Sequence, residues 1–383
     1  MRKGKLDSNR AEILYSVLEN GRGEWLEFFY TIVPREPERI ADQLAEIEQA
    51  EATLLAMFGI GPDQVAAKRF FSSDLTNHRE ALGAYRERRN TDFFFSLVEQ
   101  PPVRNVKLAM LGLCLSNITG KTRDRGLLRL DTASGVCHVF AERLTAPCAD
   151  SGASAEEQTR AIFEALEDAL GAQGLSIASS VLRTWIYTPH VDADYPGIVQ
   201  GRKAYFDRIH LTPATHYIAS TGIQGGSGER FARVSMDAYA VIGVPESKIR
   251  HIQAPDHLSP THVYGVTFER ATAVELGDRD FLFISGTASI DRHGDIVHPD
   301  DVTAQTARTL ENISALLDAA GFSRADLASV IVYLRDASDY AFVEPLVSDY
   351  ADWLPAVYVR APVCRPGWLV EIEATAARHI GSA

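Results

Sequence analysis

A helix pattern that occurs three times along the chain constrains the fold more than any other feature of the sequence. Three segments, 43–59, 158–174 and 305–321, each open on Gln and end on Gly 16 residues later. Within each segment, apolar residues recur at steps of three and four, which predicts an amphipathic helix with one buried stripe. The closing Gly suits the left-handed conformation in which many helices end. Equal spacing in three places indicates three copies of one structural unit.

Strand-like runs accompany each helix in the same order. One run precedes the helix, a second follows its Gly, and a third closes the unit. The expected strands are 25–33, 67–73 and 107–114, then 135–141, 181–187 and 233–241, and finally 281–285, 330–335 and 369–374. This order predicts an α+β fold in which each unit is a mixed sheet with helices on one face. The expected units are 1–117, 118–245 and 246–383.

Composition and charge exclude several classes of protein. Of the 383 residues, 46% are hydrophobic and 23% are charged, which is typical of a globular protein and not of a disordered or collagen-like chain. A net charge of −13 argues against nucleic acid as a partner, because phosphate binders carry positive charge. No apolar run is long enough to span a membrane, and the first residues lack the apolar stretch of a signal peptide. We therefore expect a cytoplasmic protein that contacts neither nucleic acid nor membrane.

The sequence predicts no metal and no cofactor. Its four cysteines are scattered and form no CxxC pair. His190 lies close to Asp192 and Asp194, but this group repeats no known ligand spacing. The glycine-rich run 222–228 precedes an expected strand and is not followed by the lysine of a P-loop, so we interpret it as a turn.

The third unit carries the most specific motifs. The strings Phe283-Ile-Ser-Gly-Thr-Ala-Ser289, Ile331-Val-Tyr-Leu-Arg-Asp336 and Leu369-Val-Glu-Ile-Glu-Ala374 resemble the Rid/YjgF family, strongly over 263–379 and moderately over 130–243. The resemblance implies the fold of a chorismate-mutase-like trimer with active sites in the clefts between subunits. Three such units in one chain would form an intramolecular pseudo-trimer, with one cleft keeping the chemistry. Since its interfaces are then internal, we expect a monomer or a weak dimer.

The Rid/YjgF family includes enamine and imine deaminases, in which an arginine shortly after a proline binds the substrate carboxylate. Aligning Pro355-Ala356 with that motif puts Val357 at the arginine position, and Arg360 follows three residues later. This departure weakens the deaminase interpretation but leaves it as an alternative. A non-catalytic Rid-like protein that binds a metabolite is a further alternative.

A second resemblance fits the C-terminal residues better. The string Val363-Cys-Arg-Pro-Gly-Trp-Leu-Val-Glu-Ile-Glu373 is similar to the C-terminal motif of the chorismatases, Rid-like enzymes of secondary metabolism that cleave chorismate to pyruvate and a cyclic acid. The resemblance implies that Glu371 is catalytic. In the subgroup that makes 3-hydroxybenzoate, a cysteine precedes that glutamate by seven residues, as Cys364 does here. That subgroup also tends to have glycine at the position that matches Gly286.

The segment 251–269, which leads into the third unit, departs from the chorismatase pattern. Phe268, Arg270 and Ala271 match that pattern, but Pro260-Thr-His262 stands where an arginine-bearing turn is expected. The departure leaves the substrate open, and a sister branch that acts on a different small carboxylate is compatible with it.

The expected chemistry is protonation of the enol methylene of an enolpyruvyl ether by Glu371. A carboxylic acid can donate this proton at neutral pH if burial raises its pKa. Strand alternation places Glu371 and Glu373 on the same face of an apolar strand, and the alternative for both is a salt bridge at a surface or interface. Cys364 is expected to favour attack by the substrate's own ring hydroxyl over attack by water, although a lone cysteine is more often a buried, inert residue.

An anionic substrate requires cations, and arginine binds carboxylates through two parallel hydrogen bonds. Tyrosines are expected to bind a ring hydroxyl, and small residues to let the ligand approach backbone amides. For each of these residues, the alternative is packing or solvation. The candidate substrate-binding residues are Arg183, Tyr187, Arg202, Tyr205, Thr221, Gly222, Tyr264, Phe268, Ser285, Gly286, Arg360 and Arg365. Arg270 and Arg335 are further candidate cations.

Overall fold

The strands of the computed structural model, which describes residues 1–20, 25–88, 92–146 and 152–380, form three six-stranded sheets. The first sheet contains β1 (Arg2–Asp7), β2 (Ala11–Glu19), β3 (Leu26–Pro34), β4 (Val65–Ser72), β5 (Phe94–Glu99) and β6 (Leu108–Leu115). The second contains β7 (Ile118–Asp124), β8 (Leu127–Thr132), β9 (Cys137–Thr145), β10 (Val181–Thr188), β11 (Ala219–Gln224) and β12 (Ser235–Ile242). The third contains β13 (Ile249–Ile252), β14 (Ala271–Leu276), β15 (Arg279–Ala288), β16 (Leu327–Leu334), β17 (Ala356–Arg360) and β18 (Val370–His379).

The three sheets have one topology. Their strand orders are β1-β2-β3-β6-β4-β5, β7-β8-β9-β12-β10-β11 and β13-β14-β15-β18-β16-β17. In each sheet the last two strands of this order pair in parallel and the other neighbours are antiparallel, so the sheets are mixed. The expectation of three tandem units with mixed sheets is therefore confirmed. We refer to them as the first, second and third units.

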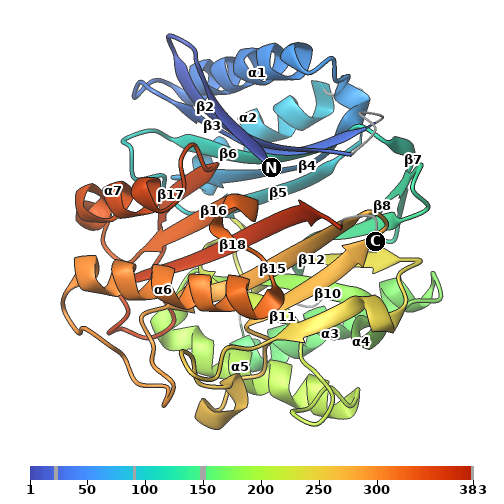
Figure 1. The fold of residues 1–383 in the computed structure, drawn as a ribbon, viewed down its shortest axis with the longest axis vertical. Coiled ribbons are helices and arrows are strands. Elements are labelled where there is room, and N and C mark those ends of the chain that lie inside the picture. The colour runs from blue at the N-terminus through green and yellow to red at the C-terminus, as the bar shows by residue number, and fades with distance from the viewer. Residues whose placement is uncertain (21–24, 89–91, 147–151, 381–383) are drawn as a thin grey trace.

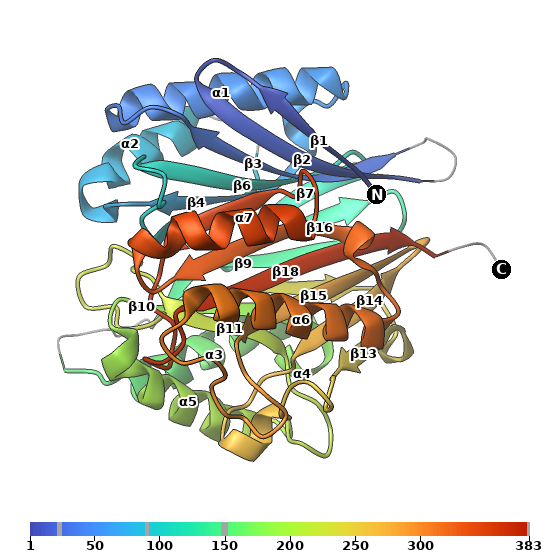
Figure 2. The same ribbon diagram turned by 60° about the vertical axis from the view of Figure 1, so that its left-hand side comes forward.

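Helices cover the outer face of each sheet (Figure 1). The helices are α1 (Ile40–Met57) and α2 (Leu75–Arg88) of the first unit, α3 (Ala155–Gly171), α4 (Ile177–Ser180) and α5 (Val191–Arg208) of the second, and α6 (Val302–Ala320) and α7 (Tyr340–Tyr350) of the third. Figure 2 shows α1 and α2 above the first sheet, α6 and α7 in front of the third, and α3 and α5 at the bottom of the molecule. None of the helices in the described ranges is long and apolar enough to cross a membrane.

The glycines that follow the helices act as the repeat predicts, and a side-chain cap begins the last long helix. Asp301 precedes α6 and its side chain accepts a hydrogen bond from the amide of Ala304 at 2.9 Å, which caps the first turn. Gly321 ends α6 with a φ of +79°, a left-handed conformation that glycine adopts without strain. Gly59 and Gly174, which follow α1 and α3, also have positive φ.

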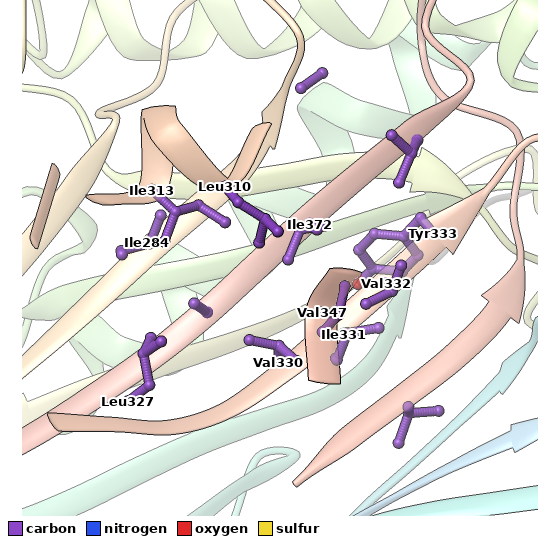
Figure 3. Close-up of a cluster of buried hydrophobic side chains, with 14 of the residues drawn as sticks. Ile284, Leu310, Ile313, Leu327, Val330, Ile331, Val332, Tyr333, Val347 and Ile372 are labelled. Atoms are coloured by element: carbon purple, nitrogen blue, oxygen red, sulfur yellow. The ribbon is translucent and has the colours of Figure 1, made fainter. Parts of the chain in front are cut away.

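The buried stripe of α6 shows how each helix packs on its own sheet. Leu310 and Ile313 of α6 lie next to Ile284 and Ile372 of the sheet (Figure 3). The inner residues of this helix and the strands beneath it belong to one apolar cluster, from which water is excluded. Removal of this apolar surface from water stabilises the unit and fixes the position of β18.

The opposite faces of the three sheets meet in the interior. One apolar cluster combines Phe94 of the first unit, Phe140 and Tyr239 of the second, and Phe281 and Phe283 of the third. The rings of Phe94 and Phe140 are 5.2 Å apart, and those of Tyr239 and Phe283 are 5.4 Å apart. The units therefore pack as the subunits of a trimer would, within one chain.

Single β-bridges also join the units in a ring. They link Glu99 to Gly226, Ile223 to Val363, and Pro102 to Val359. The first bridge joins the first and second units, the second joins the second and third, and the third returns to the first unit. The expected intramolecular pseudo-trimer is thus present.

A buried ion pair connects the first two units. Arg69 of β4 donates to Asp237 of β12 at 3.2 Å, and the hydroxyl of Ser96 in β5 donates to the same carboxylate oxygen. All three side chains are buried. Removal of one member of a buried pair leaves the other charge without compensation in the interior.

We predict that Asp237→Ala lowers the midpoint of thermal unfolding, because Arg69 loses its partner in a buried position. The expected loss of stability is about 3–5 kcal/mol. Asp131→Ala is the matched control, since Asp131 forms an ion pair with Arg129 whose side chains are each 40% exposed. Exposed pairs contribute only about 0–1 kcal/mol. Equal unfolding midpoints for the two variants would contradict the role assigned to the buried pair.

Candidate functional site

A pocket lies between the second and third units, and most of the predicted site residues line it. The second unit contributes side chains from α5 and β11, whereas the third contributes β15, β18 and the segment before each of β14 and β18. The lining residues are Tyr195, Arg202, Ser220, Gly222, Tyr264, Val266, Phe268, Arg270, Gly286, Ala288, Ile290, Cys364, Arg365, Trp368 and Glu371. A cleft between covalently linked units thus gathers residues from distant parts of the chain.

Glu371 is the acid of this pocket. Its side chain lies on β18 and is 4% exposed. Burial, reinforced by the nearby charge of Glu373, raises the pKa of Glu371 to about 8, against the opposing effects of Arg183 and Arg270. Glu371 therefore holds a proton at neutral pH and can act as a general acid.

Glu373, two residues further along β18, has a different environment. Arg183 donates to its Oε2 atom at 2.9 Å, the hydroxyl of Thr221 donates to the same atom at 2.6 Å, and the indole of Trp185 donates to Oε1 at 2.7 Å. These three donors, all from the second unit, bind both carboxyl oxygens of Glu373. The salt bridge that was an alternative for both glutamates is thus formed by Glu373.

Two glycines make room for the side chains that face the pocket. A Cβ atom on Gly286 would overlap the Oε1 atom of Glu371, and a Cβ on Gly222 would come within 2.8 Å of the ring of Tyr195. The amide of Gly286 donates to the hydroxyl of Thr221 at 3.0 Å. From the sequence we expected these glycines to make room for a ligand near the backbone. In the structure they make room for the side chains of Glu371 and Tyr195.

Three arginines surround the acid. Arg202 donates from Nε to the hydroxyl of Thr267 at 3.1 Å and from Nη1 to that of Ser220 at 3.3 Å. Its Nη2 atom is buried and has no hydrogen-bond partner within the described residues. Arg202 therefore has a donor left for a ligand.

Arg270 and Arg365 are held by main-chain oxygens and aromatic rings. Arg270 donates from Nε and Nη2 to the carbonyl oxygen of Ser259 at 3.2 and 2.7 Å. The guanidinium of Arg365 lies 4.8 Å from the ring centres of both Tyr264 and Trp368. With Glu371 protonated, the side chains that line the pocket carry the charges of three cations and no anion.

Cys364 lines the same pocket, but its thiol is not an activated nucleophile. Burial and, to a lesser extent, the proximity of Glu371 raise the pKa of Cys364 to about 12. The group is therefore a neutral thiol, and its size and low polarity shape the pocket. Among the described residues, no three His, Cys, Asp or Glu side chains come together in a group that could hold a metal ion.

Two predicted site residues lie elsewhere, which corrects their assignment. Tyr205 faces α3, where its ring stacks on Phe163 at 5.5 Å, because this side of α5 packs in the core of the second unit. Arg360 is exposed at the end of β17, and its amide bonds to Pro101 of the first unit. Neither side chain lines the pocket. Arg335, a further candidate cation, forms an ion pair with Asp192 at 2.5 Å.

Four other predicted residues lie behind the pocket wall. Arg183 and Thr221 bind Glu373, as described above. The hydroxyl of Ser285 accepts from the amide of Ser220 at 2.9 Å and donates to the carbonyl of Glu269 at 2.6 Å, so it fixes β15 against β11. Tyr187 is buried in the apolar cluster of the third unit's core. The pocket itself contains Glu371, Cys364, Arg202, Gly222, Tyr264, Phe268, Gly286 and Arg365 from the predicted set.

The prediction missed Tyr195, Ser220 and Trp368. Tyr195 precedes Arg202 on α5 by seven residues, a spacing that puts both side chains on one helix face, so the sequence did hold a signal for it. Trp368 is buried and donates from its indole to the carbonyl of Ser289 at 3.0 Å. Nothing in the sequence distinguishes this tryptophan from one that only packs.

The other two units lack the acid at the equivalent position. Glu371 pairs with Tyr333 across β18 and β16. The corresponding pairs are Ser235 with Tyr187 in the second unit, and Ala109 with Phe71 in the first. Only one of the three equivalent positions therefore carries a carboxylic acid, in agreement with the expectation that a single cleft keeps the chemistry.

Comparisons with known proteins agree with this architecture. The family model described as endoribonuclease L-PSP matches residues 270–378. A RutC family protein from Pyrococcus horikoshii is 40% identical over 107 residues, which make up 27% of this chain and 82% of the relative. The 3-aminoacrylate deaminase RutC of Acinetobacter baylyi is 33% identical over 99 residues, or 25% of this chain and 79% of the enzyme.

A solved structure extends the likeness to all three units. The crystal structure of a chorismatase superposes with a TM-score of 0.63 and covers 97% of this chain and 100% of the chorismatase chain. The sequence identity is 19%, so this similarity concerns the fold.

The pKa of Glu371 predicts how stability depends on pH. The buried carboxyl keeps its proton up to about pH 8, whereas an unperturbed glutamate releases it near 4.5, so the folded state binds more protons between these values. The contribution of Glu371 to the free energy of unfolding is therefore greatest below pH 4.5, decreases by up to about 1.4 kcal/mol per pH unit, and levels off above pH 8.

Glu371→Gln should remove this dependence, which urea unfolding at a series of pH values would measure. Glu311→Gln is the control, because the side chain of Glu311 is 64% exposed on α6. The pKa assigned to Glu371 would be refuted by a Glu371→Gln variant whose stability follows the same pH curve as the wild type.

Proposed function

The chain belongs to the Rid/YjgF (RutC) family, and we propose that it is a chorismatase-type enzyme that releases pyruvate and 3-hydroxybenzoate from chorismate. The observation that carries this proposal is the buried Glu371, whose pKa burial raises to about 8, in a pocket lined by three arginines. Cleavage of an enolpyruvyl ether requires an acid for the enol methylene, and a dianionic substrate requires cations. The pocket supplies both.

The arginines are suited to the two carboxylates of the substrate. The Nη2 atom of Arg202 is buried and has no hydrogen-bond partner among the described residues, and the guanidinium of Arg365 lies 4.8 Å from the ring centres of Tyr264 and Trp368. Tyr195 and Tyr264 are the hydroxyl groups available to the ring.

The proposed reaction begins with transfer of the Glu371 proton to the enol methylene. The side chain of the substrate becomes an oxocarbenium ion, and Glu371 becomes a carboxylate. The ring hydroxyl then attacks the ring carbon that bears the ether, the carbon–oxygen bond breaks, and its electrons form the carbonyl of pyruvate. The resulting epoxide opens and loses a ring proton as it becomes aromatic, so 3-hydroxybenzoate forms without addition of water. The proton that the attacking hydroxyl gives up restores Glu371, and the proton released on aromatisation returns to the oxygen, which becomes the phenol hydroxyl.

In the proposed mechanism, Cys364 supports the intramolecular route because it helps to exclude water from the pocket. Its thiol is neutral and close to Glu371, and Val266, Phe268 and Ile290 add apolar surface to the pocket. The apolar side chains on this part of the wall offer a water molecule no hydrogen-bond partner for attack. With water excluded, the ring hydroxyl is the nearest nucleophile to the cation.

A deaminase acting on a small imine or enamine is the second candidate. The similarity to the 3-aminoacrylate deaminase RutC over 99 residues favours it. Against it, Val357 occupies the position of the expected substrate-binding arginine and is 1% exposed in the core of the third unit. Release of ammonia from 3-aminoacrylate, with no pyruvate from chorismate, would replace the first proposal by the second. Activity on neither substrate would favour the metabolite-binding alternative.

We predict that purified protein releases pyruvate from chorismate and that Glu371→Gln lowers the rate by about 10²–10⁴-fold, the usual contribution of a general acid. A coupled assay for pyruvate measures the rate, and circular dichroism verifies the fold. The exposed Glu311→Gln variant should keep the wild-type rate. Absence of pyruvate from the wild type would reject the proposed reaction, and full activity of Glu371→Gln would reject the role of Glu371.

Replacement of the thiol should change the product rather than stop the reaction. Cys364→Ala opens space in the pocket for water, so we expect a dihydrodiol acid to appear beside 3-hydroxybenzoate, with pyruvate still released. Chromatography of the ring products measures their ratio. Cys137→Ala, at a buried position in the second sheet, is the control and should leave the ratio unchanged. An unchanged product ratio in Cys364→Ala would remove Cys364 from the proposed mechanism.

A further inference from the structure

A second cavity, of about 110 Å³, lies where the inner faces of the three sheets meet. It is separate from the pocket of Glu371, because the two share no lining residue. Its walls are mainly aromatic and aliphatic side chains from all three units. They include Phe29, Ala67, Phe94, Leu111 and Leu113 of the first unit, Phe140, Trp185 and Tyr239 of the second, and Phe281, Phe283, Val330 and Ile331 of the third.

One polar side chain in this wall lacks a hydrogen bond. His138 of β9 is 3% exposed, and its Nδ1 atom lies 2.8 Å from the hydroxyl of Tyr239. Its Nε2 atom is buried and has no hydrogen-bond partner in the part of the chain that the structure describes. Burial, with a smaller effect of Arg279, lowers the pKa of His138 to about 3, so the ring is neutral. A buried polar atom without a hydrogen bond raises the free energy of the folded protein. A ligand that forms a hydrogen bond with this atom removes that cost, which favours its binding.

The charged groups at the cavity leave no cation for an anionic ligand. Arg69 and Glu373 both line it, and each is already paired: Arg69 with Asp237, and Glu373 with Arg183. These two cations and two anions balance, so a carboxylate placed in the cavity would be a buried charge without a counter-ion.

We propose that this central cavity binds a neutral monocyclic aromatic molecule with one hydroxyl group, of which phenol is the simplest. The ring would lie among the aromatic side chains, and the hydroxyl would bond to Nε2 of His138. A hydroxyl both donates and accepts, so it satisfies that nitrogen in either tautomer. The volume is close to that of an engineered apolar cavity of about 150 Å³ that stays dry and binds benzene. The proposal is independent of the reaction proposed for Glu371.

Titration calorimetry of the full chain with phenol, toluene and benzoate tests the chemical class. Phenol should bind most tightly, toluene about fivefold more weakly for want of one hydrogen bond, and benzoate not measurably. Binding of benzoate as tight as that of phenol would overturn the exclusion of anions. The absence of phenol binding at millimolar concentration would overturn the proposal as a whole.

Two pairs of measurements locate the ligand. Ala67→Leu fills the central cavity and should weaken phenol binding at least tenfold, whereas the matched Ala288→Leu variant fills the pocket of Glu371 and should not change it. His138→Phe keeps the ring and removes Nε2, so phenol should then bind no better than toluene. Unchanged phenol affinity in Ala67→Leu would refute the location. A preference for phenol that survives in His138→Phe would refute the hydrogen bond to His138.

Discussion

The carboxylate of Glu373, held by three donors from the neighbouring unit, is the contact on which the rest of the site depends. Arg183, Trp185 and Thr221 fix its position. The fixed negative charge adds to burial in keeping the proton on Glu371, two residues away on the same strand. One interaction therefore joins the second and third units and adds to the effect of burial on the pKa of Glu371.

The strand position that Glu373 occupies in the third unit is occupied by Asp237 in the second unit and by Leu111 in the first. In the strand pairing, Glu373 lies opposite Ile331, Asp237 opposite Trp185, and Leu111 opposite Arg69. Glu373 and Asp237 are both carboxylates that bind an arginine and a hydroxyl group of the preceding unit. Leu111 instead packs against the apolar core of the third unit. At this strand position two interfaces therefore have a buried ion pair and the third has an apolar contact, while the buried pair of the third interface, Glu27 with Arg279, lies elsewhere, on β3 and β15.

The sequence was sufficient to predict the fold because its main signals are local. Helix periodicity, the glycines after each helix and the alternation within strands all follow from contacts between near neighbours in the chain. The glutamates of β18 were predicted to share a face for the same reason, and they do. Local contacts could not predict that Glu373 forms the ion pair while Glu371 is the acid of the pocket. This difference depends on Arg183, Trp185 and Thr221, which belong to another unit.

The errors at the site have the same origin. Tyr205 and Arg360 were chosen by residue type, but packing of α5 on α3 and of β17 beside the first unit turned them away from the pocket. Gly286 was correctly placed in the site, yet the neighbour that requires it to be glycine is Glu371, which is 85 residues later in the chain. Contacts of this range depend on which strands pair and how helices pack on them, and no periodicity within a segment encodes them.

Because the three units belong to one chain, the assembly of the pocket does not depend on protein concentration. In a trimer of separate subunits, dilution separates the two halves of every intersubunit cleft. Here the halves are tethered, so the effective concentration of one for the other is fixed by the linker and not by the amount of protein. The pocket between the second and third units should therefore stay assembled in a solution of arbitrarily low protein concentration, at one site per chain.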